Sequence, residues 1–431
     1  MKTAFFSALI SILSCGFAAG QAQYKVLYSF GTNPSDGAFA QMPLVSDRAG
    51  NLYGVTSQGG TEGGGVIFEL SPGSNGTWDE SVLYSFCFEY SACPSGGGPT
   101  GLAIDSSGNL YGTTQFGGNQ NCQIVDQNLG CGVAFELSPP SGQGDNWSYS
   151  VLYTFCSIGE YCEDGGGPAS TVTLDKGGNI YGTTNFGGAS FEGGGGTVYE
   201  LSHNSTGWAE TILYSFCSNI QNGYCLDGAG PEWEVTFDKA GNLYGTTYGG
   251  GSTGAEAGGT LFKLAPTSGG WTESVLSTFQ LPNKKTYSAD AGPVSIDPAD
   301  NLYTTTGQGG HFGSGAKFGY GTVKRLNGRG VVSTFFFDGT NGIGAYTGVL
   351  VDAKRGALWG TTTSGIDAYN GNAYMLDQSG HETVLYTFCQ LPRCADGQYP
   401  GGLIEDVSGN LYGTTLYGGT YGLGVVFEIT P

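Results

Sequence analysis

The residues of this sequence most suited to covalent chemistry are its cysteines, which occur in close doublets. Of the 11 cysteines, all but Cys15 fall into five doublets that lie far apart along the chain. Local disulfides are the simplest pairing, and they indicate an oxidising destination. A zinc site is the weaker interpretation, because Cys-x2-Cys spacings and converging histidines are absent, so no metal or cofactor is predicted. The predicted disulfides are Cys87–Cys93, Cys122–Cys131, Cys156–Cys162, Cys217–Cys225 and Cys389–Cys394.

No conventional catalytic set is visible in the sequence. The three histidines, His203, His311 and His381, are scattered and have no obvious Ser or Cys partner. The segment Gly250–Gly254 matches the Gly-x-Ser-x-Gly pattern, but it lies in a glycine-rich loop and not between a strand and a helix. The catalytic residues are therefore unknown at this stage. The 36 acidic residues still leave room for a carboxylate pair of the kind that glycan-active enzymes use.

Two types of side chain recur in loops where a ligand could bind. The sequence is built of repeated units, and in several of them an aromatic residue directly follows the second strand of the unit. Such residues could stack on sugar rings, although repeating aromatics more often pack between units. An aspartate precedes the first strand of the unit in six of seven units. A structural Asx turn is favoured there over a cation or ligand site. The candidate ligand-binding residues are Phe116, Phe186, Tyr248 and Tyr417, together with Asp164, Asp227 and Asp396.

The charge distribution marks one further group. The formal net charge is -21, which repels phosphate backbones and argues against a nucleic-acid partner. Against this background Lys284, Lys285 and Lys317, with His311 close in sequence, form a basic sector. Solvated loop lysines are the simpler interpretation. The functional hypothesis is that this sector binds an anionic or uronic-acid-bearing partner.

All these residues flank a repeated motif, GNLYGTT. It occurs three times unchanged and four times as a near-copy, at intervals of 53 to 70 residues. A repeat of this length without helical periodicity is typical of a propeller. The copies are Gly50–Thr56, Gly108–Thr114, Gly178–Thr184, Gly241–Thr247, Asp300–Thr306, Gly356–Thr362 and Gly409–Thr415.

Four short strands, which we call A, B, C and D, recur in each unit. The first D strand, at 24–30, precedes any A strand, and the final C strand, at 424–430, has no D strand after it. We therefore predict an all-β, seven-bladed propeller over residues 23–431, closed by pairing of the first strand in the last blade. In the second unit the strands, rich in Val, Ile, Tyr, Phe and Thr, are 101–105, 109–114, 132–138 and 147–155.

The two ends of such a blade have different loops. Successive antiparallel strands reverse direction, so the D-to-A and B-to-C connections lie on one face and the A-to-B and C-to-D connections on the other. All five cysteine doublets fall on the first, which we call the loop face. The second, the turn face, has tight turns such as Asp105–Asn109. Variable loops on a rigid scaffold concentrate binding residues, so a ligand is expected on the loop face.

Residues 1–22 are typical of an export signal. Lys2 precedes an apolar run from Ala4 to Leu13, and small residues follow at 18–22. No other apolar run is long enough to span a membrane. Soluble secretion is expected, and lipid attachment through Cys15 is the alternative, because Ile12–Cys15 loosely resembles a lipoprotein box.

The unit made of VLYSF, an Asp-Gly loop, GNLYGTT, a Gly-Gly pair and GVAFELSP resembles the bacterial extracytoplasmic tandem repeat called the GloVer (Gloeo_Verruco) repeat. The resemblance covers residues 24–431, although units five and six are degenerate, with Thr304 replacing the motif Gly and Trp359 replacing Tyr. It implies a secreted or surface-anchored repeat protein and brings no catalytic residues. We therefore expect a monomeric, non-catalytic binding or scaffold protein that recognises polysaccharide or a cell-surface protein. A glycoside hydrolase or lyase with channel-face carboxylates is the alternative.

Overall fold

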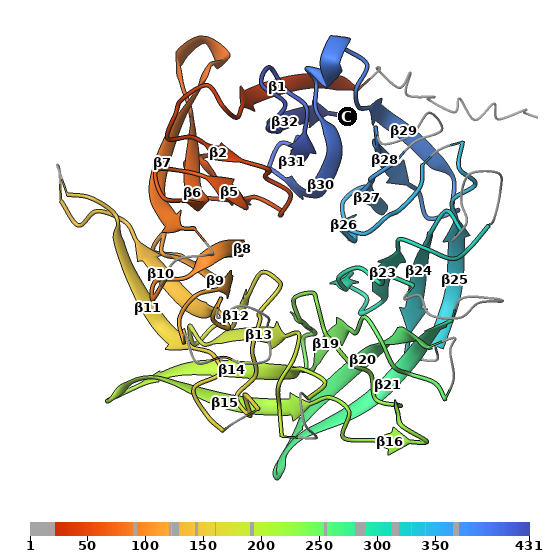
Figure 1. Ribbon diagram of the computed structural model, residues 1–431. Coiled ribbons are helices and arrows are strands. Elements are labelled where there is room, and N and C mark those ends of the chain that lie inside the picture. The colour runs from red at the N-terminus through yellow and green to blue at the C-terminus, as the bar shows by residue number, and fades with distance from the viewer. Residues whose placement is uncertain are drawn as a thin grey trace, which may run out of the picture.

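The computed structural model describes residues 22–88, 93–119, 122, 129–142, 145–159, 161–189, 194–253, 257–280, 289–311, 319–328, 330–340, 342–364 and 370–431. These residues form seven antiparallel blades arranged in a ring (Figure 1). Each blade has four strands, with the A strand nearest the central channel and the D strand at the outer edge (Figure 1). Helical structure in the described part is limited to two single turns, η1 (Ser74–Gly76) and η2 (Pro392–Cys394). The predicted seven-bladed propeller is therefore confirmed.

Within each blade the strands lie in the order A, B, C, D from the channel outwards. The A strands are β3 (Val45–Ser46), β8 (Gly97–Ile104), β12 (Thr173–Leu174), β18 (Thr236–Phe237), β22 (Ser295–Ile296), β26 (Val349–Asp352) and β30 (Gln398–Glu405). The B strands are β4 (Leu52–Val55), β9 (Leu110–Phe116), β13 (Ile180–Thr184), β19 (Leu243–Thr246), β23 (Leu302–Thr306), β27 (Ala357–Thr362) and β31 (Leu411–Tyr417). The C strands are β6 (Gly63–Pro72), β10 (Val133–Ser138), β14 (Thr197–Asn204), β20 (Ala257–Thr267), β24 (Thr322–Asn327), β28 (Asn372–Leu376) and β32 (Val425–Thr430). The D strands are β7 (Trp78–Cys87), β11 (Ser148–Thr154), β15 (Gly207–Ser215), β21 (Gly270–Gln280), β25 (Gly330–Phe336), β29 (Glu382–Thr387) and β1 (Gln23–Ser29).

Four two-residue strands lie in the connections between these elements. They are β2 (Gly37–Ala38), β5 (Gln58–Gly59), β16 (Ile220–Gln221) and β17 (Tyr224–Cys225). β5 pairs with both β2 and β6, so it links the D-to-A and B-to-C connections at blade 1. These short ladders satisfy backbone groups that long loops would otherwise leave to solvent.

The first strand of the chain lies in the last blade. β1 pairs antiparallel with β32, with residues 23–29 opposite residues 425–430. Tyr24 of β1 stacks on Tyr386 of blade 6, with ring centroids 3.8 Å apart. Without β1, the outer edge of β32 would present unpaired backbone N–H and C=O groups.

Each A-to-B turn is held by one aspartate. In blade 2, Oδ1 of Asp105 accepts hydrogen bonds from the backbone N–H groups of Ser107 (2.8 Å) and Asn109 (2.9 Å), and Oδ2 accepts one from the Asn109 side chain (2.9 Å). Such an Asx turn satisfies polar groups that a tight turn leaves unpaired. The same bonds recur in five other blades, at Asp47, Asp175, Asp238, Asp297 and Asp406.

The apolar part of the motif packs the blades together. Leu110 is fully buried, and Tyr111 is buried with its hydroxyl near the Asp105 carboxylate. A Cβ atom at Gly112 would lie 2.6 Å from Cζ of Phe135, so glycine leaves the room that this ring needs.

The two threonines of the motif make hydrogen bonds that connect elements. Thr113 donates from Oγ1 to the carbonyl of Ser170 in the next blade (3.1 Å). Thr114 donates to the carbonyl of Phe116 (2.9 Å) and accepts from the N–H of Val133 (3.1 Å). GNLYGTT is therefore a structural motif that sets the turn, the blade packing and the start of the B-to-C loop.

Candidate functional site

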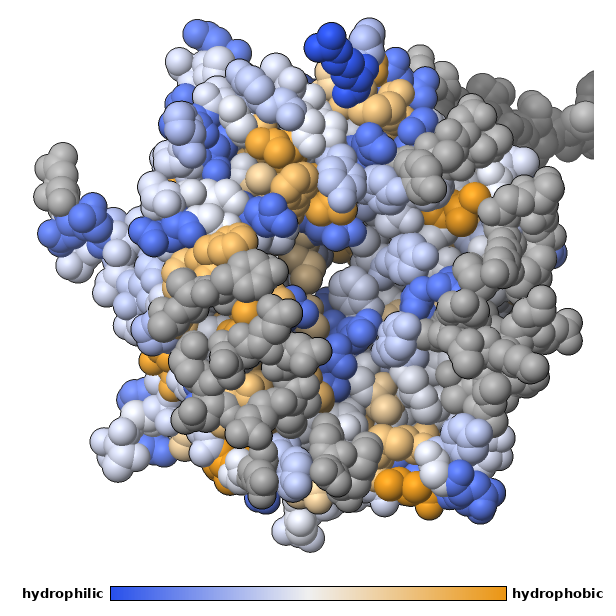
Figure 2. Space-filling view, in the orientation of Figure 1, coloured by the Kyte–Doolittle hydropathy of each residue, from blue (hydrophilic) through white to orange (hydrophobic). Residues whose placement is uncertain are grey.

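The loop face surrounds the mouth of the central channel. The space-filling view shows an opening near the centre of the ring, bordered by hydrophobic and hydrophilic residues (Figure 2). Two variable residues follow the last threonine of each motif at this mouth, for example Gln115 and Phe116 in blade 2 and Leu416 and Tyr417 in blade 7. The chemistry of the mouth therefore changes from blade to blade above a constant scaffold.

Blades 7, 1 and 2 form a pocket of about 310 Å³ at this mouth, which we call the amide pocket. Phe116 lines it beside the exposed side chains of Gln58 and Gln115. An aromatic ring next to amide groups can stack on a sugar and hydrogen-bond its hydroxyl groups. Among the residues that the structure describes, no carboxylate lines this pocket; the lining is Phe39, Gln41, Met42, Val55, Ser57, Gln58, Gly63, Gly64, Phe88, Gly98, Pro99, Thr100, Gln115, Phe116, Ala169 and Leu416.

The sector of the mouth formed by blades 3 to 5 is acidic. Gln308 donates from Nε2 to Oδ2 of Asp290 (2.5 Å), and Asn185 donates from Nδ2 to Oε1 of Glu232 (3.4 Å). Burial and the charge of Asp290 raise the pKa of Glu232 above its usual range. Burial, Asp290 and Glu232 together raise the pKa of Tyr248. This acidic sector has the ingredients of a general acid beside a second carboxylate.

The three candidate aspartates are buried and bonded within their own D-to-A loops. Asp164, Asp227 and Asp396 are at most 2% exposed. Each accepts a hydrogen bond of 2.7 to 2.8 Å from a D-strand tyrosine hydroxyl. Each also accepts from a backbone N–H of its loop. These contacts are those of a structural clasp, and they leave little surface for a ligand.

The four candidate aromatic residues occupy different environments. Phe116 lines the amide pocket. Tyr417 is 42% exposed and meets Phe39 of that pocket edge-on, with centroids 5.6 Å apart. Tyr248 is 48% exposed and belongs to the acidic sector. Phe186 is half-buried against the core between blades 2 and 3. The structure thus places Phe116 in the amide pocket and Tyr417 against its lining residue Phe39, and it places the other two elsewhere.

Lys284, Lys285 and Lys317 lie outside the described residues. His311, the other member of the predicted basic sector, packs against Phe336 with ring centroids 5.2 Å apart. It lies at a groove of about 670 Å³ between blades 5 and 6.

At this groove the D strand of blade 6 has no tryptophan. At four other interfaces a tryptophan near the start of the D strand packs on the preceding blade, as Trp208 does on Tyr111, with centroids 6.5 Å apart. Gly380 stands at the corresponding position of blade 6, so Tyr303 of blade 5 lines the groove instead of being covered. The four tryptophans are Trp78, Trp147, Trp208 and Trp271.

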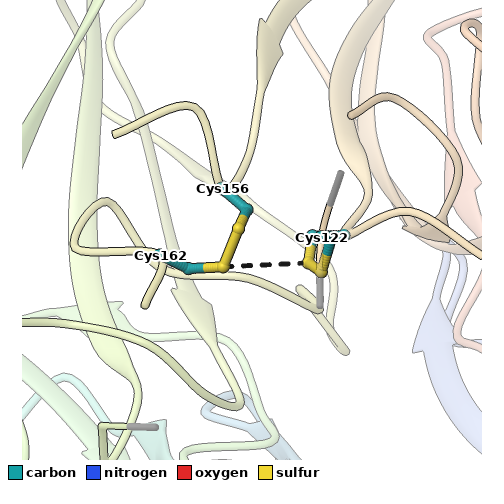
Figure 3. Close-up of side chains that lie close together, drawn as sticks. Cys122, Cys156 and Cys162 are labelled. Atoms are coloured by element: carbon teal, nitrogen blue, oxygen red, sulfur yellow. Dashed lines mark hydrogen bonds between the residues drawn. A yellow bond between two sulfur atoms is a disulfide. The ribbon is translucent and has the colours of Figure 1, made fainter. Parts of the chain in front are cut away.

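The five disulfides join the doublets that the spacing predicts: Cys87–Cys93, Cys122–Cys131, Cys156–Cys162, Cys217–Cys225 and Cys389–Cys394. Two of these bridges meet on the loop face (Figure 3). The Cys122–Cys131 bridge belongs to the B-to-C loop of blade 2, and the Cys156–Cys162 bridge to the D-to-A loop that follows. Sγ of Cys131 lies 4.0 Å from Sγ of Cys162. Sequence spacing does not reveal this approach, because it joins two separate connections.

Carboxyl groups also meet between blades. The Tyr153 hydroxyl lies 2.8 Å from Oδ2 of Asp164 and 3.1 Å from Oε2 of Glu210. It is therefore within hydrogen-bond distance of two carboxyl groups. Burial and the charge of Asp164 raise the pKa of Glu210 to about 8. The equivalent glutamates, each with a pKa raised to about 7 by burial and a neighbouring aspartate, are Glu80 near Asp36 and Glu273 near Asp227.

Sequence inspection singled out Tyr248 of the acidic sector but not Glu232, and it singled out none of the amide side chains. A signal for the amides was present, because Gln115 and Asn185 directly follow the threonine pair at positions that vary among otherwise constant repeats. Glu232 had no such signal. It is one of 36 acidic residues, and only its burial and the nearby charge of Asp290 in the folded protein distinguish it from the others.

Comparison with known proteins establishes the family. The model of the Gloeobacter/Verrucomicrobia repeat matches residues 16–159 and 126–325, which together make up more than half of the chain. The chain belongs to the Gloeobacter/Verrucomicrobia repeat family. This agrees with the resemblance carried by its GNLYGTT units. No curated protein sequence matches this repeat protein.

One similar solved structure is PorZ, an essential bacterial surface component of the type-IX secretion system of Porphyromonas gingivalis. It is 13% identical, with a TM-score of 0.49, and the match covers 92% of this repeat protein and 47% of the PorZ chain. The repeat protein therefore spans about half the length of PorZ. Within the described residues, no helix has the length and apolar character needed to cross a bilayer.

Proposed function

We propose that this repeat-family protein is exported and binds a polysaccharide, without catalysis, at the amide pocket of its loop face. The observation that carries the proposal is the convergence of Phe116 with Gln58 and Gln115 at the channel mouth. A rigid ring holds the backbone of these residues, so little backbone conformational entropy is lost when a sugar binds. The absence of carboxylates among the described lining residues favours recognition over hydrolysis at this pocket.

Export is supported by the cysteines. Ten of them lie in disulfides, which persist in oxidising compartments and are rare in the cytosol. The formal charge of -21 keeps such a protein soluble outside the cell. Together with the apolar N-terminal segment, these features favour secretion.

A glycan array probed with the intact protein tests the binding proposal. Phe116→Ala and Gln115→Ala should each weaken glycan binding about tenfold, because one loses the stacking surface and the other a hydrogen-bonding group. Tyr224→Ala is the matched control, since Tyr224 is an exposed loop-face aromatic that does not line the amide pocket. Absence of glycan binding by the parent, or equal binding by all three variants, would refute the proposal. In that case, capture of a surface protein becomes the better hypothesis.

A second candidate function, glycan cleavage, is favoured by the acidic sector. Glu232 has a raised pKa and lies near Asp290, as a general acid and its partner would. Reducing-end assays on mixed plant and bacterial polysaccharides distinguish the two functions. Release of reducing ends by the parent and its loss in Glu232→Gln would establish an enzyme, whereas binding without release supports a recognition protein.

A further inference from the structure

Four cysteine sulfurs gather at one point of the loop face. Cys122, Cys131, Cys156 and Cys162 are all buried, and their Sγ atoms lie within 4.8 Å of one another. Figure 3 shows the Cys156–Cys162 bridge pointing towards the bridge of Cys122, with the contact between them drawn as a dashed line. Among the described residues this is the one group of three or more metal-ligating side chains gathered so closely.

The separation between the two bridges is close to the sulfur–sulfur distance of a tetrathiolate metal centre. A tetrahedral Zn²⁺ ion with Zn–S bonds of about 2.3 Å holds its four sulfurs about 3.8 Å apart. The distance of 4.0 Å between Sγ of Cys131 and Sγ of Cys162, which belong to different bridges, is close to this value. A disulfide framework has no need to place two bridges in contact, and the other three bridges of this chain take no part in such a group.

The two loops are held together by contacts other than the disulfides. The N–H of Gly167 donates to the carbonyl of Cys131 (2.9 Å). The side chain of Asn119 donates to the carbonyl of Cys156. These hydrogen bonds join the B-to-C loop of blade 2 to the following D-to-A loop through backbone groups. The contact between the two loops therefore has support besides the two disulfides.

We propose that Cys122, Cys131, Cys156 and Cys162, in their thiol state, form a binding site for a soft divalent cation of the Zn²⁺ class. These four cysteines would then have two bonding states, a pair of disulfides and a metal tetrathiolate. An exported chain begins with thiols, so the cation can bind before oxidation. Thiolates are the preferred protein ligands of such ions, and binding to a folded site stabilises the folded state.

The interconversion balances in electrons and protons. Each bridge takes up two electrons and two protons from a dithiol reductant and becomes two thiols, while the dithiol becomes a disulfide. Binding of one divalent cation to the four thiols releases four protons and leaves a centre of charge minus two. In the reverse direction two molecules of a small-molecule disulfide accept the four electrons, take up four protons and become four thiols, while the two bridges reform and the cation is released.

Titration of the fully reduced protein with Co²⁺ and Zn²⁺ tests the proposal. We expect one Co²⁺ per chain with the visible absorption of a tetrahedral thiolate centre, displacement of that signal by Zn²⁺, and no such signal from the oxidised protein. The variant Cys131→Ser with Cys162→Ser should lose the signal. The matched variant Cys217→Ser with Cys225→Ser, which opens an isolated bridge, should keep it.

A second readout covers the fold itself. Zn²⁺ should raise the thermal midpoint of the reduced parent and of the Cys217/Cys225 variant, but not that of the Cys131/Cys162 variant. A folded reduced parent that takes up no stoichiometric Co²⁺ would overturn the proposal, as would equal uptake by both double variants. A reduced parent that is unfolded both with and without Zn²⁺ would also overturn it, because a tetrathiolate site adds its binding free energy to folding.

Discussion

The turn face and the loop face arise from the same strands, yet their residues have different tasks. On the turn face, Asp105 and its five equivalents accept the same three hydrogen bonds blade after blade. On the loop face, the two residues after the threonine pair are Gln115 and Phe116 in one blade and Leu416 and Tyr417 in another. In this protein, exact repetition marks the scaffold, and departure from the repeat marks the candidate site.

Removal of the first strand is expected to have the largest effect, because both faces depend on an intact ring. Deleting residues 23–30 removes β1 and the fully buried Phe30 and leaves the edge of β32 unpaired. We expect aggregation or a large fall in thermal stability, measured by size-exclusion chromatography and calorimetry. A chain beginning at Ala22 is the control. A deleted protein that stays monomeric and unfolds at the control temperature would contradict this prediction.

Loss of an aspartate that holds an A-to-B turn should have the next largest effect. Asp105→Ala removes the acceptor of three hydrogen bonds and should lower the free energy of unfolding by about 2 to 3 kcal/mol, since each bond contributes about 1 kcal/mol. Guanidinium unfolding measures the change. Glu62→Ala, at an exposed acidic residue of the loop face, is the matched control and should be neutral. Equal stability of both variants would show that the aspartate hydrogen bonds do not stabilise the A-to-B turns.

The carboxyl groups between blades should make the stability of the fold depend on pH, an effect that we expect to be smaller. The pKa values of Glu80, Glu210 and Glu273 are raised to about 7, 8 and 7, so the folded state binds more protons than the unfolded state between about pH 4.5 and 8. Stability should therefore be greatest in mild acid and should fall as the pH rises through 7 and 8.

Unfolding midpoints measured at several pH values test this prediction. Glu210→Gln should flatten part of the slope, because the neutral amide keeps a polar group beside Tyr153 without adding a charge near Asp164. Glu62→Gln should leave the slope unchanged. A parent whose stability rises from pH 5 to 8 would contradict the pKa assignment.

Opening one isolated bridge should have the smallest effect. The Cys217–Cys225 bridge closes a loop across 8 positions, for which the chain-entropy model predicts about 2 kcal/mol. In the variant Cys217→Ser with Cys225→Ser, hydrogen exchange should increase in the surrounding loop and remain unchanged at the A-to-B turns. Faster exchange at both faces would show that the two faces are coupled.

Much of the fold followed from short-range pattern. Seven GNLYGTT copies predicted seven blades, because each copy contains its own turn, core residues and interblade contacts within seven residues. The disulfides could also be predicted, since cysteines 5 to 9 residues apart in one loop have few other partners within reach. The candidate site was only partly predictable. The sequence singled out Phe116, which lines the amide pocket, but not its neighbours Gln58 and Gln115.

Repetition along the chain was sufficient to establish the blades, their order and the residues that hold each turn. The contacts between blades depended on three-dimensional folding. Cys131 and Cys162 are 31 residues apart, and Tyr153 and Glu210 are 57 apart, yet each pair is in contact. Loop lengths differ from unit to unit, so no constant spacing marks such neighbours. The twist of each blade and the curvature of the ring bring them together, because packing both faces of every sheet sets the position of the next blade.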